Sequence, residues 1–131
     1  MQIEDAQRRL IAKKIRGDFE QFWDAAVENG GSEFIKYVYA LLFRVYELHL
    51  EGSYMTKMQA CRYIPLQHAA TCKKYMDMAA EKGFFDYSTL ESDQRKIIVR
   101  PGPELLNFVE ERISSSAVEL EEIFQSIEHK I

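Results

Sequence analysis

The chain has 131 residues, of which 47% are hydrophobic and 29% are charged, and its formal net charge is -4. This length and composition are typical of one globular domain, so we expect a single domain over residues 1–131 rather than a disordered chain. No apolar run reaches the roughly 18 residues of a membrane span, and the N-terminus lacks a signal-peptide pattern, which favours a cytoplasmic protein that does not enter membranes.

Residues 1–50 are expected to form two N-terminal helices. The first is expected over residues 3–28, where apolar side chains recur at helical spacing at Ile11, Ile15, Phe19, Phe22 and Ala26. The second is expected from Glu33 to Leu50. It is apolar over so much of its surface that we expect it to be the central, most buried helix.

Residues 54–100 contain two further helices and a hairpin. Thr56 is suited to cap a short helix that ends near Tyr63. Pro65 is suited to the first position of the next helix, which we expect over residues 66–82. A strand over 84–87, a polar loop over 88–94 and a β-branched strand over 96–99 then predict a hairpin. Helix, turn, longer helix and hairpin in this order are typical of a winged helix-turn-helix, with residues 86–97 as its wing.

The C-terminal segment 101–131 is expected to be one long helix or two shorter ones, because the serines at 114–116 weaken its middle. Its apolar residues repeat in a heptad-like manner, which favours pairing with another helix. We therefore expect this segment to dimerise the protein through Leu106, Val109, Ile113, Leu120, Ile123 and Ile127.

Charge is unevenly distributed along the chain. Residues 52–76 contain no Asp or Glu but four cations, whereas residues 104–128 contain seven glutamates. A basic region on the helices that would face a duplex favours DNA binding, although charge runs are usually solvated faces. Cys61 and Cys72 are too few for a disulfide framework, and a redox switch stays an open alternative. His68 with these two thiols lacks a fourth metal ligand, so we expect no metal or other cofactor and interpret His68 as a core histidine.

Four short motifs resemble the MarR family of winged-helix regulators: residues 71–74 (TCKK), 81–85 (EKGFF), 93–95 (DQR) and 99–102 (VRPG). The resemblance implies a mainly α-helical winged helix-turn-helix with long N- and C-terminal dimerisation helices and one β-hairpin wing. It also implies a homodimer that reads a pseudo-palindromic operator in double-stranded DNA and that releases the DNA when a small ligand binds.

The DNA-contacting residues are expected on the helix over 66–82 and on the wing. Gln67, Thr71 and Lys74 are suited to base edges in the major groove, while Lys73 is suited to the phosphate backbone. Arg95 would enter the minor groove, with Asp93 holding its guanidinium. Further contacts are expected from Thr56, Lys57 and Lys96.

Three alternatives to these predictions stay open. The charged hairpin tip could be simply solvated, and the same fold could serve as a protein-interaction module that does not bind DNA. The aromatic residues Trp23, Tyr37, Tyr39 and Tyr46 could line a pocket for a small aromatic effector, or they could be core residues. No catalytic triad, P-loop or dinucleotide fingerprint is present, so we expect no enzyme activity.

Overall fold

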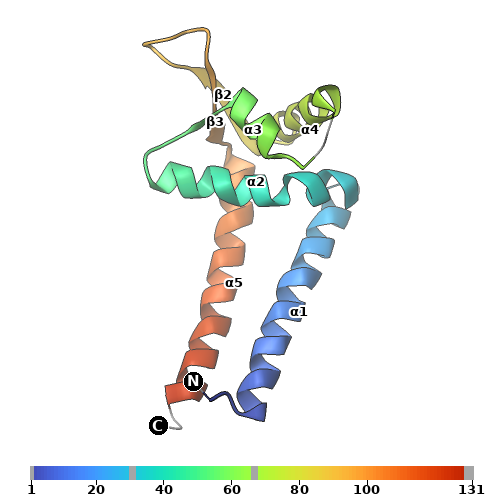
Figure 1. Ribbon diagram of the computed structural model, residues 1–131, viewed down its shortest axis with the longest axis vertical. Coiled ribbons are helices and arrows are strands. Elements are labelled where there is room, and N and C mark those ends of the chain that lie inside the picture. Colours follow the sequence, from blue (N-terminus) through green and yellow to red (C-terminus); the bar gives the residue numbers. More distant parts are fainter. Residues whose placement is uncertain (1, 30–31, 66–67, 129–131) are drawn as a thin grey trace.

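The computed structural model describes residues 2–29, 32–65 and 68–128. Over these residues the chain forms five helices and three short strands (Figure 1). The elements in chain order are α1 (Asp5–Glu28), α2 (Ser32–Leu50), β1 (Met55–Thr56), α3 (Lys57–Tyr63), α4 (Ala69–Glu81), β2 (Phe85–Thr89), β3 (Ile97–Pro101) and α5 (Pro103–Glu128).

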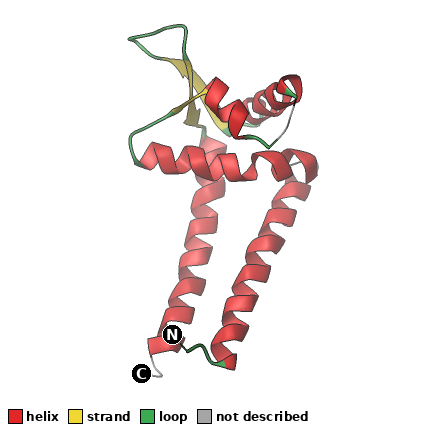
Figure 2. Ribbon diagram, viewed as in Figure 1, coloured by secondary structure: helices red, strands yellow, loops and turns green. Residues whose placement is uncertain are grey.

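The long helices α1 and α5 form a two-helix stalk, and α2 lies across one end of it (Figure 1). On the other side of α2, away from the stalk, lie α3, α4 and the β-hairpin (Figure 2). The prediction of a mainly helical winged helix-turn-helix with one hairpin wing is therefore confirmed. Within the described ranges, none of the helices has the length and apolar character needed to cross a membrane.

Helix α2 forms the centre of the core, as its composition predicts. Its side chains Ile35, Val38, Leu41 and Leu42 are completely buried. The helix contacts α1 and α5 of the stalk, and it also contacts α4 and β3. It therefore joins the stalk to residues 54–101, which we call the winged unit. Because burying a large aliphatic side chain contributes about 1.5–3 kcal/mol, the burial of these four side chains makes a large contribution to the stability of the fold.

The sheet is antiparallel and has the order β1-β3-β2. Strand β2 continues two residues further than the sequence predicts, to Thr89, which pairs with Ile97. Strand β3 likewise continues two residues further, to Pro101. Strand β1 is absent from the sequence prediction. It has two residues, paired with Ile98 and Val99, and such a short strand leaves no periodicity to detect.

The start of α4 differs from the prediction. Ile64 is buried and fixes the end of α3, so Pro65 stays exposed in the turn and does not begin the helix. Helix α4 begins at Ala69, with His68 in an extended conformation as its N-cap residue. His68 is exposed there, so its interpretation as a core histidine is wrong. The predicted helical residues 66 and 67, and with them the predicted DNA contact Gln67, lie outside the described residues.

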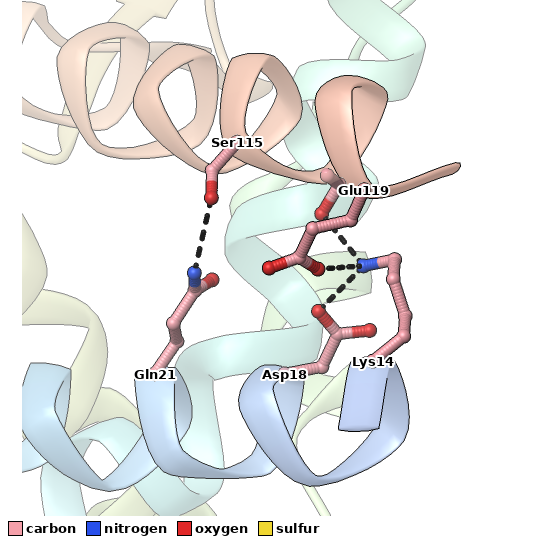
Figure 3. Close-up of polar contacts among 6 residues, drawn as sticks. Lys14, Asp18, Gln21, Ser115 and Glu119 are labelled. Atoms are coloured by element: carbon pink, nitrogen blue, oxygen red, sulfur yellow. Dashed lines mark hydrogen bonds and ion pairs between the residues drawn. The ribbon is translucent and has the colours of Figure 1, made fainter. Parts of the chain in front are cut away.

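Helix α5 is continuous through its three serines, and two of them bind α1 (Figure 3). The ammonium of Lys14 lies 2.7 Å from Asp18 Oδ1, 3.3 Å from Glu119 Oε2 and 3.1 Å from Ser116 Oγ. About two turns further along α1, Gln21 Nε2 donates to Ser115 Oγ at 3.5 Å. Desolvation alone would lower the pKa of Lys14, but the hydrogen bonds to Asp18 and Glu119 and the charges of these carboxylates outweigh it. The pKa of Lys14 is therefore raised overall, and the ammonium stays charged.

The heptad-like repeat of α5 divides between two surfaces. Val109 and Ile123 are buried within the subunit, so the prediction that they lie in a dimer interface is wrong. The physical reason is that this side of the helix already faces the chain's own core. The other heptad positions are Leu106, Ile113, Leu120 and Ile127, and of these Ile113 and Leu120 are exposed.

Two glycines bring the end of α4 and the start of α5 into direct backbone contact. Gly83 has a φ of 81°, a left-handed conformation that favours glycine, and it follows the last turn of α4. The amide of Gly102 donates to Phe84 O at 2.8 Å, and the amide of Glu104 donates to Gly83 O at 3.2 Å. A Cβ atom on Gly102 would overlap the carbonyl oxygen of Gly83 and lie 2.9 Å from its carbonyl carbon.

Gly102→Ala should therefore lower the free energy of unfolding by about 2 kcal/mol or more, because backbone atoms must move apart to admit the methyl group. Gly17→Ala is the matched control. Nothing lies within 4 Å of a Cβ at Gly17, inside α1, so this change should stabilise the protein by about 0.5–1 kcal/mol. Urea unfolding measures both variants, and equal stability of the two would contradict the contact.

Candidate nucleic-acid interface

The winged unit carries a charge opposite to that of the rest of the chain. Residues 54–101 contain eight Lys and Arg against five Asp and Glu, a net charge of +3, so the remaining residues carry -7. The long axis of the molecule separates α4 and the hairpin tip from the far end of the stalk (Figure 1). One end of the protein is therefore positive, which attracts polyanions to that end.

The outer face of α4 presents two exposed cations to solvent. Cys72, Tyr75, Met76 and Ala79 are buried and fix the rotation of the helix about its axis. This rotation leaves Lys73 and Lys74 exposed and Thr71 half-buried on the opposite face, as the sequence predicts. A shallow hollow follows this face and is lined by Ala70, Lys73, Lys74, Asp77, Met78 and Glu81. The cations lie in the N-terminal half of the helix and the carboxylates in the C-terminal half.

Thr56 caps α3 through a complete capping box. Its hydroxyl accepts a hydrogen bond from Gln59 N at 3.1 Å, while its own amide donates to Gln59 Oε1 at 2.9 Å. The predicted cap is confirmed, and it fixes the first turn of α3 in front of α4. The hydroxyl of Thr56 is thus already engaged within the protein, and its DNA contact stays a prediction.

Lys57 has two partners inside the winged unit. Its Nζ lies 3.4 Å from Asp77 Oδ1 in α4 and 4.7 Å from the ring centroid of Tyr87 in β2. The Tyr87 hydroxyl in turn donates to Met76 O at 2.9 Å. Of the predicted DNA-contact residues whose side chains are described, Lys57 is the most enclosed cation, with 25% of its side chain exposed.

The wing tip is ordered by Asp93. Its Oδ1 accepts from the amide of Arg95 at 3.1 Å and from Arg95 Nε at 3.4 Å. The predicted contact between the two side chains is confirmed. Arg95 is 93% exposed in its side chain, and Lys96 beside it is exposed as well. Asp93 therefore holds the base of a guanidinium that projects from the hairpin into solvent.

Arg100, which was not predicted as a site residue from the sequence, forms a second ordered cation on the hairpin. Its Nε donates to Ser88 Oγ at 3.0 Å, and its guanidinium carbon lies 4.3 Å from the ring centroid of Tyr54. Arg100 pairs with Asp86 across the two strands, and Ser88 is the next residue on the same face of β2. The alternation of a strand predicts this placement once the register is known, but the sequence alone does not fix the register.

The two thiols and the four aromatic residues named from the sequence lie in different surroundings. Cys72 is buried, and burial raises the pKa of the half-buried Cys61 thiol, which disfavours the reactive thiolate. Within the described ranges, no group of three His, Cys, Asp or Glu side chains could hold a metal ion. The four aromatic residues named for an effector pocket are spread over different contacts: Trp23 and Tyr39 both contact Phe22, whereas Tyr37 packs on Tyr75. The fourth, Tyr46, is partly buried and packs against the hydrophobic core.

No protein-family model matches the sequence, and no curated protein matches it significantly. Solved structures do match. A MarR transcriptional regulator from Methanosarcina mazei Go1 aligns over 94% of this chain and 82% of its own, with a TM-score of 0.51 and 17% identity. The chain therefore has the fold of a MarR-type winged-helix regulator, in agreement with the resemblance found in the sequence.

Two further structures align with lower TM-scores. Bordetella bronchiseptica BpsR, whose DNA binding is regulated by 6-hydroxynicotinic acid, aligns over 95% of this chain and 78% of its own, with a TM-score of 0.47 and 17% identity. A probable transcriptional regulator from Pseudomonas aeruginosa aligns over 92% of this chain and 94% of its own, with a TM-score of 0.46 and 19% identity.

Tyr87→Phe tests the contact that joins the wing to α4. We expect the free energy of unfolding to fall by about 1 kcal/mol at neutral pH, because Met76 O loses a donor. Burial, and then the charge of Asp77, raise the pKa of Tyr87 above its unfolded value of about 10. The native state therefore holds the proton more tightly, so this stabilisation is complete below about pH 10 and is lost as the pH rises further.

Urea unfolding from about pH 7 to about pH 11 measures this difference, with Tyr63→Phe on a more exposed ring as the control. The gap in stability between the wild type and Tyr87→Phe should shrink at the upper end of this range. A gap that is the same at every pH would contradict the assigned role of the Tyr87 hydroxyl.

Proposed function

We propose that the protein is a DNA-binding transcriptional regulator that inserts α4 into the major groove and places the hairpin tip at the minor groove. The observation that carries the proposal is the net positive charge of the winged unit, with exposed cations on α4 and at the hairpin tip, in a chain that is acidic elsewhere. A helix fits the major groove, and a positive surface gains affinity by releasing counterions from the phosphates.

In this proposal the side chains of α4 divide into two roles. Thr71 and Lys74 reach base edges, since a hydroxyl can bond a base or touch a thymine methyl and an ammonium can bond guanine. Lys73 contacts the phosphate backbone, which adds affinity without reading sequence. Gln67, which lies outside the described residues, would add an adenine contact. At the hairpin, Arg95 enters the minor groove, where narrow A·T tracts concentrate negative potential, and Lys96 adds a phosphate contact.

Lys73→Ala/Lys74→Ala should weaken DNA binding by about tenfold or more and lower the slope of log K against log salt by about 1, because Lys73 loses a phosphate contact and Lys74 loses a base contact. Fluorescence anisotropy measures this with a labelled duplex from the region upstream of the protein's own gene, over a salt series. Lys13→Ala/Arg16→Ala is the matched control, since it removes two exposed charges from the stalk.

The control should bind with nearly wild-type affinity and slope. Wild-type protein that binds no duplex at low salt would contradict the DNA-binding proposal. The same fold would then be better explained as a protein-interaction module, which the acidic surface outside the winged unit would favour.

We further propose that the stalk dimerises with a second copy of the chain. Two apolar stripes on it are exposed in the single subunit. On α1 the stripe consists of Ile15, Phe19, Trp23 and Val27, and on α5 it consists of Ile113, Leu120 and Phe124, continued by the partly exposed Leu106 and Ile127. Monomeric proteins rarely expose contiguous apolar surface of this extent. A two-fold dimer would present two copies of α4 to half-sites about one helical turn of DNA apart.

Leu120→Glu should convert the dimer into a monomer, because it places a charge in the apolar stripe of α5. Val118→Glu is the matched control, since Val118 is an exposed apolar residue of the same helix that lies outside the stripe. Light scattering coupled to size exclusion gives the mass of each variant. A dimeric Leu120→Glu protein, or a monomeric wild type, would contradict the proposed interface.

A further inference from the structure

The ammonium of Lys57 is the point at which α3, α4 and β2 meet. Lys57 is the first residue of α3, and the capping box of Thr56 fixes the direction in which its side chain leaves the helix. Its Nζ lies 3.4 Å from Asp77 Oδ1 and 4.7 Å from the centroid of the Tyr87 ring. Three-quarters of the side chain is removed from solvent, so the ammonium has little freedom to change its position.

Tyr87 ties the same cluster to the backbone of α4. Its hydroxyl donates to the carbonyl of Met76, the residue that precedes Asp77. Burial raises the pKa of Tyr87, so the phenol remains a donor throughout the physiological range. The ring that faces the ammonium and the carboxylate that pairs with it are therefore both fixed relative to the same turn of α4.

Asp77 lies on the face of α4 that we propose to enter the major groove. It lines the same shallow hollow as Lys73 and Lys74 and follows them by about one helical turn. Its side chain is 51% exposed. A carboxylate in this position would repel the phosphates that the two lysines attract, unless a cation compensates its charge.

We propose that Lys57 is a positioning residue for DNA binding: it neutralises Asp77 on the DNA-facing side of α4 and holds α4 against the first strand of the hairpin, and it does not itself contact DNA. This inference rests on the proposed DNA-binding function. It replaces the direct DNA contact that the sequence predicts for Lys57 with an action through Asp77.

The test compares Lys57→Met, Asp77→Asn and the double variant Lys57→Met/Asp77→Asn in the anisotropy assay described above. Methionine keeps most of the aliphatic length and removes the charge. Lys57→Met should weaken binding by about fivefold, since Asp77 is left uncompensated in front of the phosphates, and the double variant should recover to within about twofold of Asp77→Asn. Lys57→Arg, which keeps the charge, should also bind within about twofold of the wild type.

The salt series separates this role from a direct phosphate contact. If Lys57 acts through Asp77, the double variant keeps the slope of log K against log salt of the wild type. If Lys57 touches a phosphate, Lys57→Met and the double variant both lose about 1 from that slope, and Asp77→Asn restores nothing. Lys13→Met, which removes one exposed charge from the stalk, gives the size of the general charge effect.

The outcomes distinguish this inference from the proposal beneath it. Wild-type protein that binds no duplex would overturn the proposed function and this inference with it. Wild-type binding together with a double variant as weak as Lys57→Met would overturn this inference alone. Circular dichroism of each variant confirms that the helices are intact, and Asp77→Asn should bind at least as tightly as the wild type.

Discussion

The burial of α2 is the constraint on which the rest of the structure depends. Its apolar side chains contact the stalk on one side and the winged unit on the other, so a single helix forms the core of both parts. Over the described residues, buried side chains of α2, the stalk and the winged unit belong to one hydrophobic cluster. The orientation of α4 and of the hairpin relative to the stalk therefore follows from the packing of α2, and so does the spacing of the two DNA-facing surfaces in the proposed dimer.

Within this frame, the proposed DNA-binding surface is built from local contacts that fix charge. The capping box of Thr56 orients α3, the close contact between Gly83 and Gly102 fixes the exit of the hairpin toward α5, and Asp93 orders the guanidinium of Arg95. A cation that is already ordered loses little conformational entropy when it binds a phosphate. The acidic residues lie mostly on the stalk, where they do not oppose a polyanion bound at the far end.

Much of the fold could be predicted from the sequence because its signals are local. The apolar composition of α2, the cap at Thr56 and the β-branched strand that begins near Ile97 each depend on a few neighbouring residues. The inward-facing side of α4 also follows from helical spacing, which is why Lys73 and Lys74 are exposed as predicted.

The remaining features depend on tertiary contacts that no local pattern contains. Pro65 has the chemistry of a first helical residue, but the anchoring of Ile64 in the core moves the helix start to Ala69. The heptad repeat of α5 does not show which of its two stripes faces the chain's own core, and Val109 lies on that inner stripe. The partners of Lys57 are 20 and 30 residues away in the sequence, so its enclosure by Asp77 and Tyr87 leaves no signal near position 57.

Hydrogen–deuterium exchange with and without bound duplex tests the central claim most directly, because it locates the contact surface without any substitution. We expect added duplex to slow exchange in α4 and in the hairpin tip over residues 90–96, while the first two turns of α1 exchange at an unchanged rate. Slower exchange confined to the stalk, with α4 unaffected, would contradict the proposal that the winged unit is the DNA-binding surface.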